Sequence, residues 1–246
     1  MKTIGLIGGM SWESTAFYYK YINEGVKERL GGLHSAKCLL YSFDFAEVVR
    51  LQQAGQWKRA GALLAEAAVR LEAGGCDVVL ICTNTMHTVA EDVQRAIGIP
   101  LLHIIDVTAN EVKRQAIRKV GLLGTLYTME QPFYRQRLRQ LGIEAIVPEK
   151  ADRIRVHDVI FRELCRGELN PSSKADYLHM IGRLREQGAE GVILGCTEIP
   201  LLISEEDSPL PLFDTTFLHA NAAVEYALNG RLTSLPVPSG FPQEAP

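Results

Sequence analysis

The sequence lacks an excess of charge of either sign and any long apolar run. Its 246 residues carry 26 Lys and Arg against 29 Asp and Glu, so the net charge of -3 forces no polycationic face on the protein. We therefore expect no nucleic-acid partner. The unbroken apolar stretches are only a few residues long, far short of a membrane span, so we expect no membrane contact. Hydrophobic residues, at 47%, still suffice for one large core or two smaller ones.

The cysteines are few and follow no metal-binding or disulfide pattern. There are five, an odd number, with no C-x-x-C pair and no histidine partner at zinc spacing, so we expect no metal site. Free thiols are typical of a reducing compartment, so we expect the protein in the cytoplasm. A buried free cysteine most often packs as a small apolar side chain. We expect this structural role for four of the five, Cys38, Cys76, Cys82 and Cys165.

Short apolar runs alternate with amphipathic stretches along the chain. Runs of this kind are typical of strands buried on both faces of a parallel sheet. Residues 57–73 and 174–187 have apolar side chains at three- and four-residue spacing, which predicts helices. The predicted strands are residues 3–7, 37–42, 77–81, 101–105, 119–123, 143–147, 191–194 and 211–213. This alternation predicts an α/β fold.

The two halves of the chain repeat each other weakly. The strand and glycine turn at residues 5–9 match residues 121–125, and residues 75–83 match residues 188–196. A third match between the halves pairs Asp106 with Asp214. We therefore expect two similar α/β domains with parallel-sheet cores, related by pseudo-symmetry, with the active site in the cleft between them.

The repeat also suggests where the domains begin and end. We expect the N-terminal domain to comprise residues 1–106 plus about 215–229, and the C-terminal domain residues 107–214. Residues 230–246 are rich in proline and have no periodic pattern, so we expect an extended or disordered tail.

Polar side chains follow the matching strand of each half. Ligands of open α/β sheets bind beyond the carboxyl ends of the strands. Superposing the repeats sets Thr83 opposite Cys196, so the cleft would have a hydroxyl on one side and a thiol on the other. A reaction at a stereocentre needs such a pair, because a proton leaves one face and returns on the other.

These motifs resemble those of the cofactor-independent aspartate/glutamate racemases. The resemblance extends to about Asn229 and is carried by residues 8–11 (Gly-Gly-Met-Ser), 84–87 (Asn-Thr-Met-His) and 195–198 (Gly-Cys-Thr-Glu). The family's usual first motif is Cys-Asn-Thr-Ala-His, whereas Thr83 precedes Asn84 here. The second family cysteine is present as Cys196. The chain resembles most closely a branch with a Thr/Cys pair that acts on L-aspartate or L-glutamate.

The resemblance implies a racemase of a small acidic amino acid with Thr83 and Cys196 as its acid/base pair. It further implies that no cofactor is needed and that the protein is a dimer. The implied substrate-binding residues are Met10, Ser11, Gln52, Asn84, Thr85, Thr197 and Glu198. Gln52 could equally be an ordinary surface residue. His87 and Glu198 could tune the catalytic groups, and His87 could instead be a core histidine. A thiol with an ordinary pKa of about 8.5 would need such tuning to act as a base at neutral pH.

Other functions stay open at this point. A decarboxylase or isomerase of the same superfamily needs only one thiol, and a non-catalytic amino-acid binding protein needs none. A nucleotide-dependent enzyme would need a phosphate loop, but the glycines at 5, 8 and 9 do not have the G-x-G-x-x-G spacing. Arg50 and Arg166 could pair with a substrate side-chain carboxylate or be solvated helix arginines.

Overall fold

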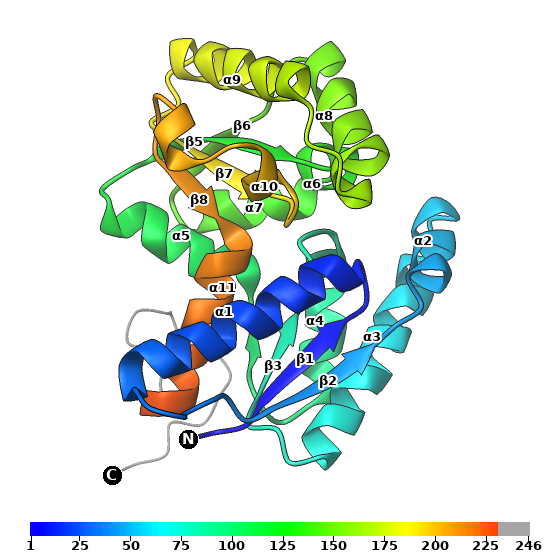
Figure 1. Cartoon of the computed structure of the whole chain (residues 1–246). Helices are drawn as coiled ribbons and strands as arrows, with labels where there is room; N and C mark the ends of the chain where they lie inside the picture. The colour runs from blue at the N-terminus through cyan, green and yellow to red at the C-terminus, as the bar shows by residue number, and fades with distance from the viewer. Residues whose placement is uncertain (231–246) are drawn as a thin grey trace.

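The computed structural model describes residues 1–230, which form two four-stranded parallel sheets (Figure 1). Sheet A has the strand order β2-β1-β3-β4, and sheet B has the order β6-β5-β7-β8. Their bounds are β1 (Ile4–Gly8), β2 (Cys38–Ser42), β3 (Val78–Ile81), β4 (Leu101–Leu102), β5 (Lys119–Gly124), β6 (Glu144–Ile146), β7 (Gly191–Gly195) and β8 (Leu212–Asp214). The prediction of two similar α/β units with parallel sheets is confirmed. The predicted tail lies outside the described residues, apart from Gly230.

The helices cover both faces of each sheet. Those of the first unit are α1 (Trp12–Leu30), α2 (Phe45–Gln53), α3 (Trp57–Ala73) and α4 (Ala90–Ala96), with the short 3-10 helix η1 (Thr85–Val89). The others are α5 (Ile104–Arg114), α6 (Leu126–Glu130), α7 (Pro132–Gln140), α8 (Lys150–Arg162), η2 (Leu164–Arg166), α9 (Pro171–Glu186), α10 (Ile199–Leu202), η3 (Glu205–Asp207) and α11 (Thr215–Asn229). The predicted helix at 57–73 has the bounds of α3, and the one at 174–187 begins three residues earlier, as α9.

Successive residues of the strands enter opposite layers of the core. In β1, Leu6 packs with Val78 and Leu80 of β3 in one cluster, whereas Ile7 packs with Val79 in another. All five are fully buried. A buried aliphatic side chain of this size stabilises the fold by about 1.5–3 kcal/mol. The continuous apolar runs of the sequence therefore follow from helices lying on both faces of the sheet.

The predicted strand at residues 101–105 is wrong at its carboxyl end. β4 stops at Leu102, and Ile104 and Ile105 are the first residues of α5, both fully buried. The apolar run continues because this helix begins with its buried face, which periodicity alone cannot separate from a strand. The third match between the two halves is shifted for the same reason. His103 and Asp214, rather than Asp106 and Asp214, are the N-caps of equivalent helices.

The two units exchange their last helices. α5 follows the last strand of sheet A, but its residues Ile105 and Val112 pack with Val120 of β5 in the core of sheet B. α11 follows the last strand of sheet B, but Ala220 packs in one cluster with Leu6 of sheet A. Figure 1 shows α11 lying beside α1. The predicted boundary at residue 106 lies inside α5, so we propose residue 103 in its place, and the packing of α11 supports its assignment to the first unit.

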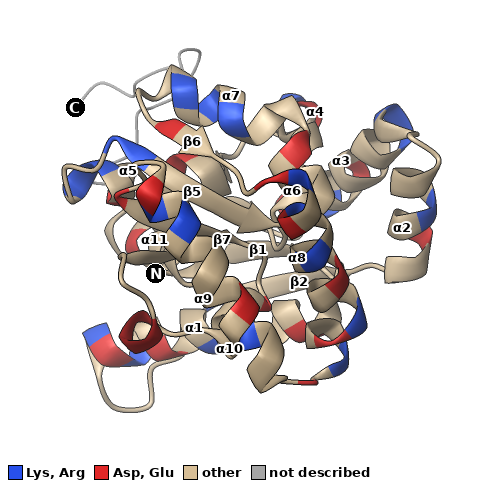
Figure 2. Cartoon of the chain, turned by 90° about the horizontal axis from the view of Figure 1, so that it is seen from above, with Lys and Arg blue, Asp and Glu red and all other residues tan. Residues whose placement is uncertain are grey.

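Most charged residues belong to the outer helices (Figure 2). In this view the strands are almost free of Lys, Arg, Asp and Glu, and basic and acidic residues are interspersed on the helices around them. Within residues 1–230, no helix combines the length and the apolar character needed to cross a bilayer.

Gly9 forms the turn that follows β1 and requires a backbone that favours glycine. Its φ is +82°, and a Cβ there would lie 2.3 Å from the carbonyl oxygen of Phe43. Backbone strain alone would lower the free energy of unfolding of Gly9→Ala by about 1–3 kcal/mol. The clash with Phe43 should make the loss larger than that. Urea denaturation measures this loss.

Gly142→Ala is the matched control for Gly9→Ala. Gly142 has a φ of +80°, and a Cβ added there would have no atom within 4 Å. The two substitutions thus share the strain and differ in the close approach to Phe43. Equal losses of stability in the two variants would show that this approach carries no energetic weight.

Candidate active site

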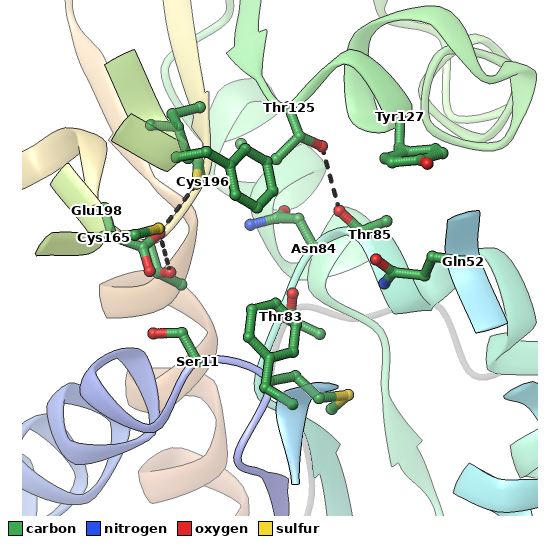
Figure 3. Close-up of a pocket in the computed structure, with 16 residues that line it drawn as sticks. Ser11, Gln52, Thr83, Asn84, Thr85, Thr125, Tyr127, Cys165, Cys196 and Glu198 are labelled. Carbon is green, nitrogen blue, oxygen red and sulfur yellow. Dashed lines mark hydrogen bonds between the residues drawn. The ribbon is translucent and has the colours of Figure 1, made fainter. Parts of the chain in front are cut away.

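A pocket lies between the two units, at the carboxyl ends of the central strands of both sheets (Figure 3). It holds about 530 Å³ of empty space, its mouth included. Its lining comes from both units and comprises Met10, Ser11, Phe45, Gln52, Thr83, Asn84, Thr85, Thr125, Tyr127, Ile160, Phe161, Cys165, Gly195, Cys196, Thr197 and Glu198. The structure therefore brings together all the sequence-predicted site residues except His87.

Thr83 reaches the pocket from the end of β3. Its amide donates to the carbonyl of Ile81 at 2.8 Å, which turns the chain out of the strand. The side chain is half-buried and has no hydrogen-bond partner among residues 1–230, so its hydroxyl is free to meet a ligand. Cys82, one position earlier, is fully buried in the core with Tyr18, as expected from the alternation of side chains.

Cys196 reaches the pocket from the end of β7, on the wall contributed by the other unit. Its thiol is 8% exposed and donates to Oε2 of Glu198 at 2.9 Å. Burial, followed by the neighbouring Glu198 carboxylate, raises the pKa of the Cys196 thiol well above its ordinary value. The expected tuning by His87 is not seen in this pocket, because the Glu198 carboxylate and not a histidine lies beside the sulfur.

His87 lies behind Thr83 rather than in the pocket. Its Nε2 accepts from the amide of Ile104 at 3.2 Å, so the ring proton is on Nδ1 and is donated to the carbonyl of Thr83 at 2.8 Å. Burial, with a smaller effect of His219, lowers the pKa of His87 to about 3. The neutral ring offers no positive charge to a catalytic group. It links the backbone of Thr83 to the start of α5.

Three histidines lie in contact behind the pocket, and two of them, His87 and His219, are buried. The ring centre of His87 is 4.7 Å from that of His103 and 5.7 Å from that of His219. Nε2 of His219 donates to the carbonyl of Leu102 at 2.9 Å, so Nδ1 of the neutral ring accepts from the hydroxyl of Tyr18 at 2.8 Å. Burial lowers the pKa of His219 to about 4. These rings are held neutral where the two units meet.

The buried histidines predict a loss of stability in mild acid. Their pKa values are depressed from 6.5 to about 3 for His87 and about 4 for His219, so the unfolded chain binds more protons between these limits. The stabilisation is complete above pH 6.5 and is lost as the pH falls from there toward 4, by up to about 1.4 kcal/mol per pH unit for each histidine. Urea midpoints at several pH values measure this slope. His219→Gln should flatten it, and identical slopes would contradict the assignment.

The racemase resemblance can now be tested against known proteins. Residues 7–223 match the Asp/Glu/Hydantoin racemase family. The chain belongs to this family. The match spans both sheets and includes the segments that carry Thr83 and Cys196.

Several racemase-family proteins are similar to this chain over much of its length. The crystal structure of a candidate Asp/Glu racemase from Yersinia pestis is 54% identical, with a TM-score of 0.88, and covers 93% of this chain and 100% of that one. An aspartate racemase homologue from Pyrococcus horikoshii is 36% identical, with a TM-score of 0.83 and the same coverage of 93% and 100%. The broad specificity amino-acid racemase RacX of Bacillus subtilis is 26% identical over 65% of this chain and 68% of its own length.

The racemase-family pocket holds the predicted binding residues in defined positions. Gln52 donates to the sulfur of Met86 at 3.0 Å, and Thr85 lies 3.3 Å from the hydroxyl of Thr125 across the two units. Asn84 donates to Thr215 at 2.9 Å, and the Thr215 hydroxyl proton is committed to the carbonyl of Leu194. These bonds fix the amide orientation of Asn84. Its Oδ1 atom is buried and has no partner among the described residues, which leaves an acceptor for a ligand.

Several lining residues were not predicted from the sequence. Phe45, Tyr127, Ile160 and Phe161 lie on helices or at their ends, away from the strand ends that the repeat singles out. Cys165, expected to be only structural, lines the pocket, and burial together with Glu198 raises its pKa to about 12. No signal in the sequence distinguishes these residues from other apolar helix positions.

The two arginines considered as carboxylate partners lie outside the pocket lining. Arg50 is exposed and donates to the carbonyl of Ala46 within its own helix, and Arg166 is exposed. They fit the interpretation of solvated helix arginines. Among residues 1–230, no group of three or more His, Cys, Asp or Glu side chains is arranged to hold a metal ion.

Proposed function

We propose that this racemase-family protein inverts the Cα centre of a small acidic amino acid, L-aspartate or L-glutamate, without a cofactor. The observation that carries the proposal is that Thr83 and Cys196 line one pocket from different units. A substrate held between them would present one face of Cα to a thiol and the other to a hydroxyl. This arrangement suits removal and return of a proton on opposite faces.

In the L-to-D direction, Cys196 acts as the base. Its thiolate takes the Cα proton, an S–H bond forms, and the electron pair of the C–H bond stays on the substrate as a carbanion. Thr83 delivers its hydroxyl proton to the opposite face, and water returns a proton to the Thr83 oxygen. The hydroxide that remains takes the proton of the Cys196 thiol, which restores the thiolate. In the reverse direction Thr83 must accept a proton, which a hydroxyl does poorly at neutral pH.

The other lining residues bind and orient the substrate. The unpartnered Oδ1 of Asn84 is an acceptor suited to the substrate ammonium group. The hydroxyls of Ser11 and Thr85 and the amide of Gln52 are donors for carboxylate oxygens. Donors aimed at the carboxylate would also stabilise the negative charge that develops when the Cα proton leaves.

One observation favours a second candidate, an amino acid with a neutral side chain. No Lys or Arg is among the residues that line the pocket within the described part of the chain. A second carboxylate would then depend on neutral donors, such as Gln52 and Tyr127. The similarity to RacX, a broad specificity racemase, points the same way, whereas the similarity to the Pyrococcus aspartate racemase homologue supports an acidic substrate.

One experiment separates these possibilities. Dialysed protein is incubated in deuterated water with each amino acid, with a chelator and without pyridoxal phosphate, and Cα deuteration and chirality are measured. Exchange with inversion of aspartate or glutamate supports the proposal, and exchange confined to neutral amino acids supports the second candidate. Turnover of a malonate would indicate a decarboxylase, and binding without exchange an amino-acid binding protein. Activity that requires added metal or pyridoxal phosphate would contradict cofactor independence.

We also propose a cytoplasmic location and a homodimer. The five cysteines are all free, which suits a reducing compartment. The dimer rests on the family resemblance alone. Sedimentation of the purified protein at several concentrations measures the oligomeric state.

A further inference from the structure

Ser14 makes a contact between the two units for which the proposed function has no role. It lies in the first turn of α1, is 2% exposed, and its Oγ is 2.7 Å from Oε1 of Glu198 and 2.5 Å from Oγ1 of Thr197. Thr197 in turn donates to Oε2 of Glu198 at 2.7 Å. Ser14, Thr197 and Glu198 thus form a closed triangle of three short oxygen contacts, which we call the Glu198 ring.

The Glu198 ring is one proton short when Glu198 is ionised. Ser14 and Thr197 bring one hydroxyl proton each, and a carboxylate brings none. Ser11 lies 3.2 Å from Ser14, but its proton goes to Glu13 at 3.0 Å, so it supplies none to the ring. Two protons therefore serve three contacts, and one pair of oxygens faces each other without a hydrogen bond.

The thiol of Cys196 holds the missing proton. It donates to Oε2 of Glu198 at 2.9 Å. If this proton moves to Glu198, the S–H bond breaks, an O–H bond forms, and the sulfur becomes a thiolate. Each of the three oxygen contacts can then hold one proton. Only the sulfur contact loses its proton, and hydrogen bonds from S–H are weaker than those from O–H.

We propose that the Glu198 ring stores the thiol proton of Cys196, and that Ser14 is the positioning residue that closes the ring from the opposite unit. This inference rests on the proposed function for its role in catalysis, but the storage step itself involves no substrate. Moving the proton within the pair leaves the net charge of the buried site unchanged. The thiolate forms without placing a second negative charge beside the first, which burial would oppose.

The ring also makes thiolate formation depend on contact between the two units. Ser14 belongs to the unit of sheet A, whereas Cys196, Thr197 and Glu198 follow β7 of sheet B. Separation of the units would remove Ser14 and leave two protons for the two remaining contacts of Glu198. The thiol form would then satisfy every contact, so thiolate formation depends on the Ser14 hydroxyl that the other unit contributes.

The test is the ionisation of Cys196 in the absence of substrate. Iodoacetamide alkylation of this cysteine is followed by peptide mass spectrometry across a range of pH, for wild type and Ser14→Ala. The variant should have its alkylation midpoint raised by at least about one pH unit, so that the rate near neutral pH falls about tenfold. The plateau rate at high pH reports access to the sulfur, and a looser pocket would raise it, which is opposite to the expected loss. Midpoints within about 0.3 pH unit of each other would overturn the proposal.

Thr197→Val and the double variant make the test specific to a ring. Either single substitution breaks the triangle, so both should raise the midpoint and the double variant should raise it no further. Additive shifts would overturn the ring. Ser173→Ala is the matched control, because buried Ser173 donates to Glu163 at 2.5 Å outside the pocket lining. It should leave the midpoint unchanged.

The alkylation midpoint of Cys196 also depends on the other titratable groups near it. Cys165 of η2 acts on Cys196, and Glu13 of α1 acts on Cys165. Cys196 in turn acts on Tyr177 of α9, and none of these groups is altered in the variants. Alkylation needs no turnover, so the two proposals fail separately. An unchanged midpoint with intact racemisation rejects the ring alone, and a shifted midpoint without racemisation by wild type rejects the proposed function alone.

Discussion

Cys196→Ala should abolish exchange of the Cα proton of the L-enantiomer while the protein stays folded. Cys196 contributes the ionisable group on one wall of the pocket, and loss of a general base costs about 10²–10⁴-fold in rate. The side chain is small and packs at the end of β7, so its truncation leaves little space in the core. Deuterium uptake measured by mass spectrometry checks the loss of exchange, and circular dichroism checks the fold.

Cys165→Ala is the control for this experiment. Cys165 lines the same pocket, on the same wall as Cys196, and also lies beside Glu198. Its removal should leave most of the exchange intact. Retention of more than about a tenth of wild-type exchange in Cys196→Ala would assign the base to another group.

Thr83→Ala should separate exchange from inversion. Cys196 would still remove and return the proton on its own face, so the L-enantiomer should exchange its Cα proton with retention of configuration. No group on the opposite face would deliver a proton, so inversion should fall by about 10²-fold or more. Chiral chromatography and deuterium uptake on the same samples measure the two rates. Equal losses of exchange and inversion would show that Thr83 only shapes the pocket.

Thr83→Cys provides the complementary result. A thiol has a pKa near 8.5 and can accept a proton near neutral pH, which a threonine hydroxyl cannot. Turnover of the D-enantiomer should therefore rise relative to wild type. The equilibrium between free enantiomers is unity, so the asymmetry of the wild type must appear as matched differences in kcat and KM. Unchanged kinetics of the D-enantiomer would contradict the role of Thr83 as the second acid/base group.

The fold was predictable where the sequence pattern and the burial agree. Strands such as β1 and β7 are buried along their whole length, so their apolar runs stand out from the amphipathic helices. The prediction failed at Ile104 and Ile105, where a helix begins on its buried face. The exchange of α5 and α11 could not be predicted, because the periodicity of a helix shows that a face is buried but not which sheet covers it.

The site was predictable at the strand ends and not elsewhere. Thr83 and Cys196 stand out because the internal repeat places both after equivalent strands of parallel sheets. Ser14 and Tyr127 carry no such mark, since they approach the pocket from helices and their proximity depends on how the units pack. Glu198 was an expected pocket residue and also an expected tuning residue, but the sequence does not give its contact with Cys196. Only the structure shows it accepting from the thiol.

The exchange of α5 and α11 makes the molecule an internally domain-swapped pair. Severing the chain between the two repeats would leave each half with a sheet face stripped of its covering helix, since Leu6 would lose Ala220 and Val120 would lose Ile105. Neither half therefore has the complete core that independent folding requires. Because each unit is completed by a helix from the other, we expect the two walls of the pocket to fold as one cooperative unit. Folding would then also align the Cys196 thiol with the Thr83 hydroxyl.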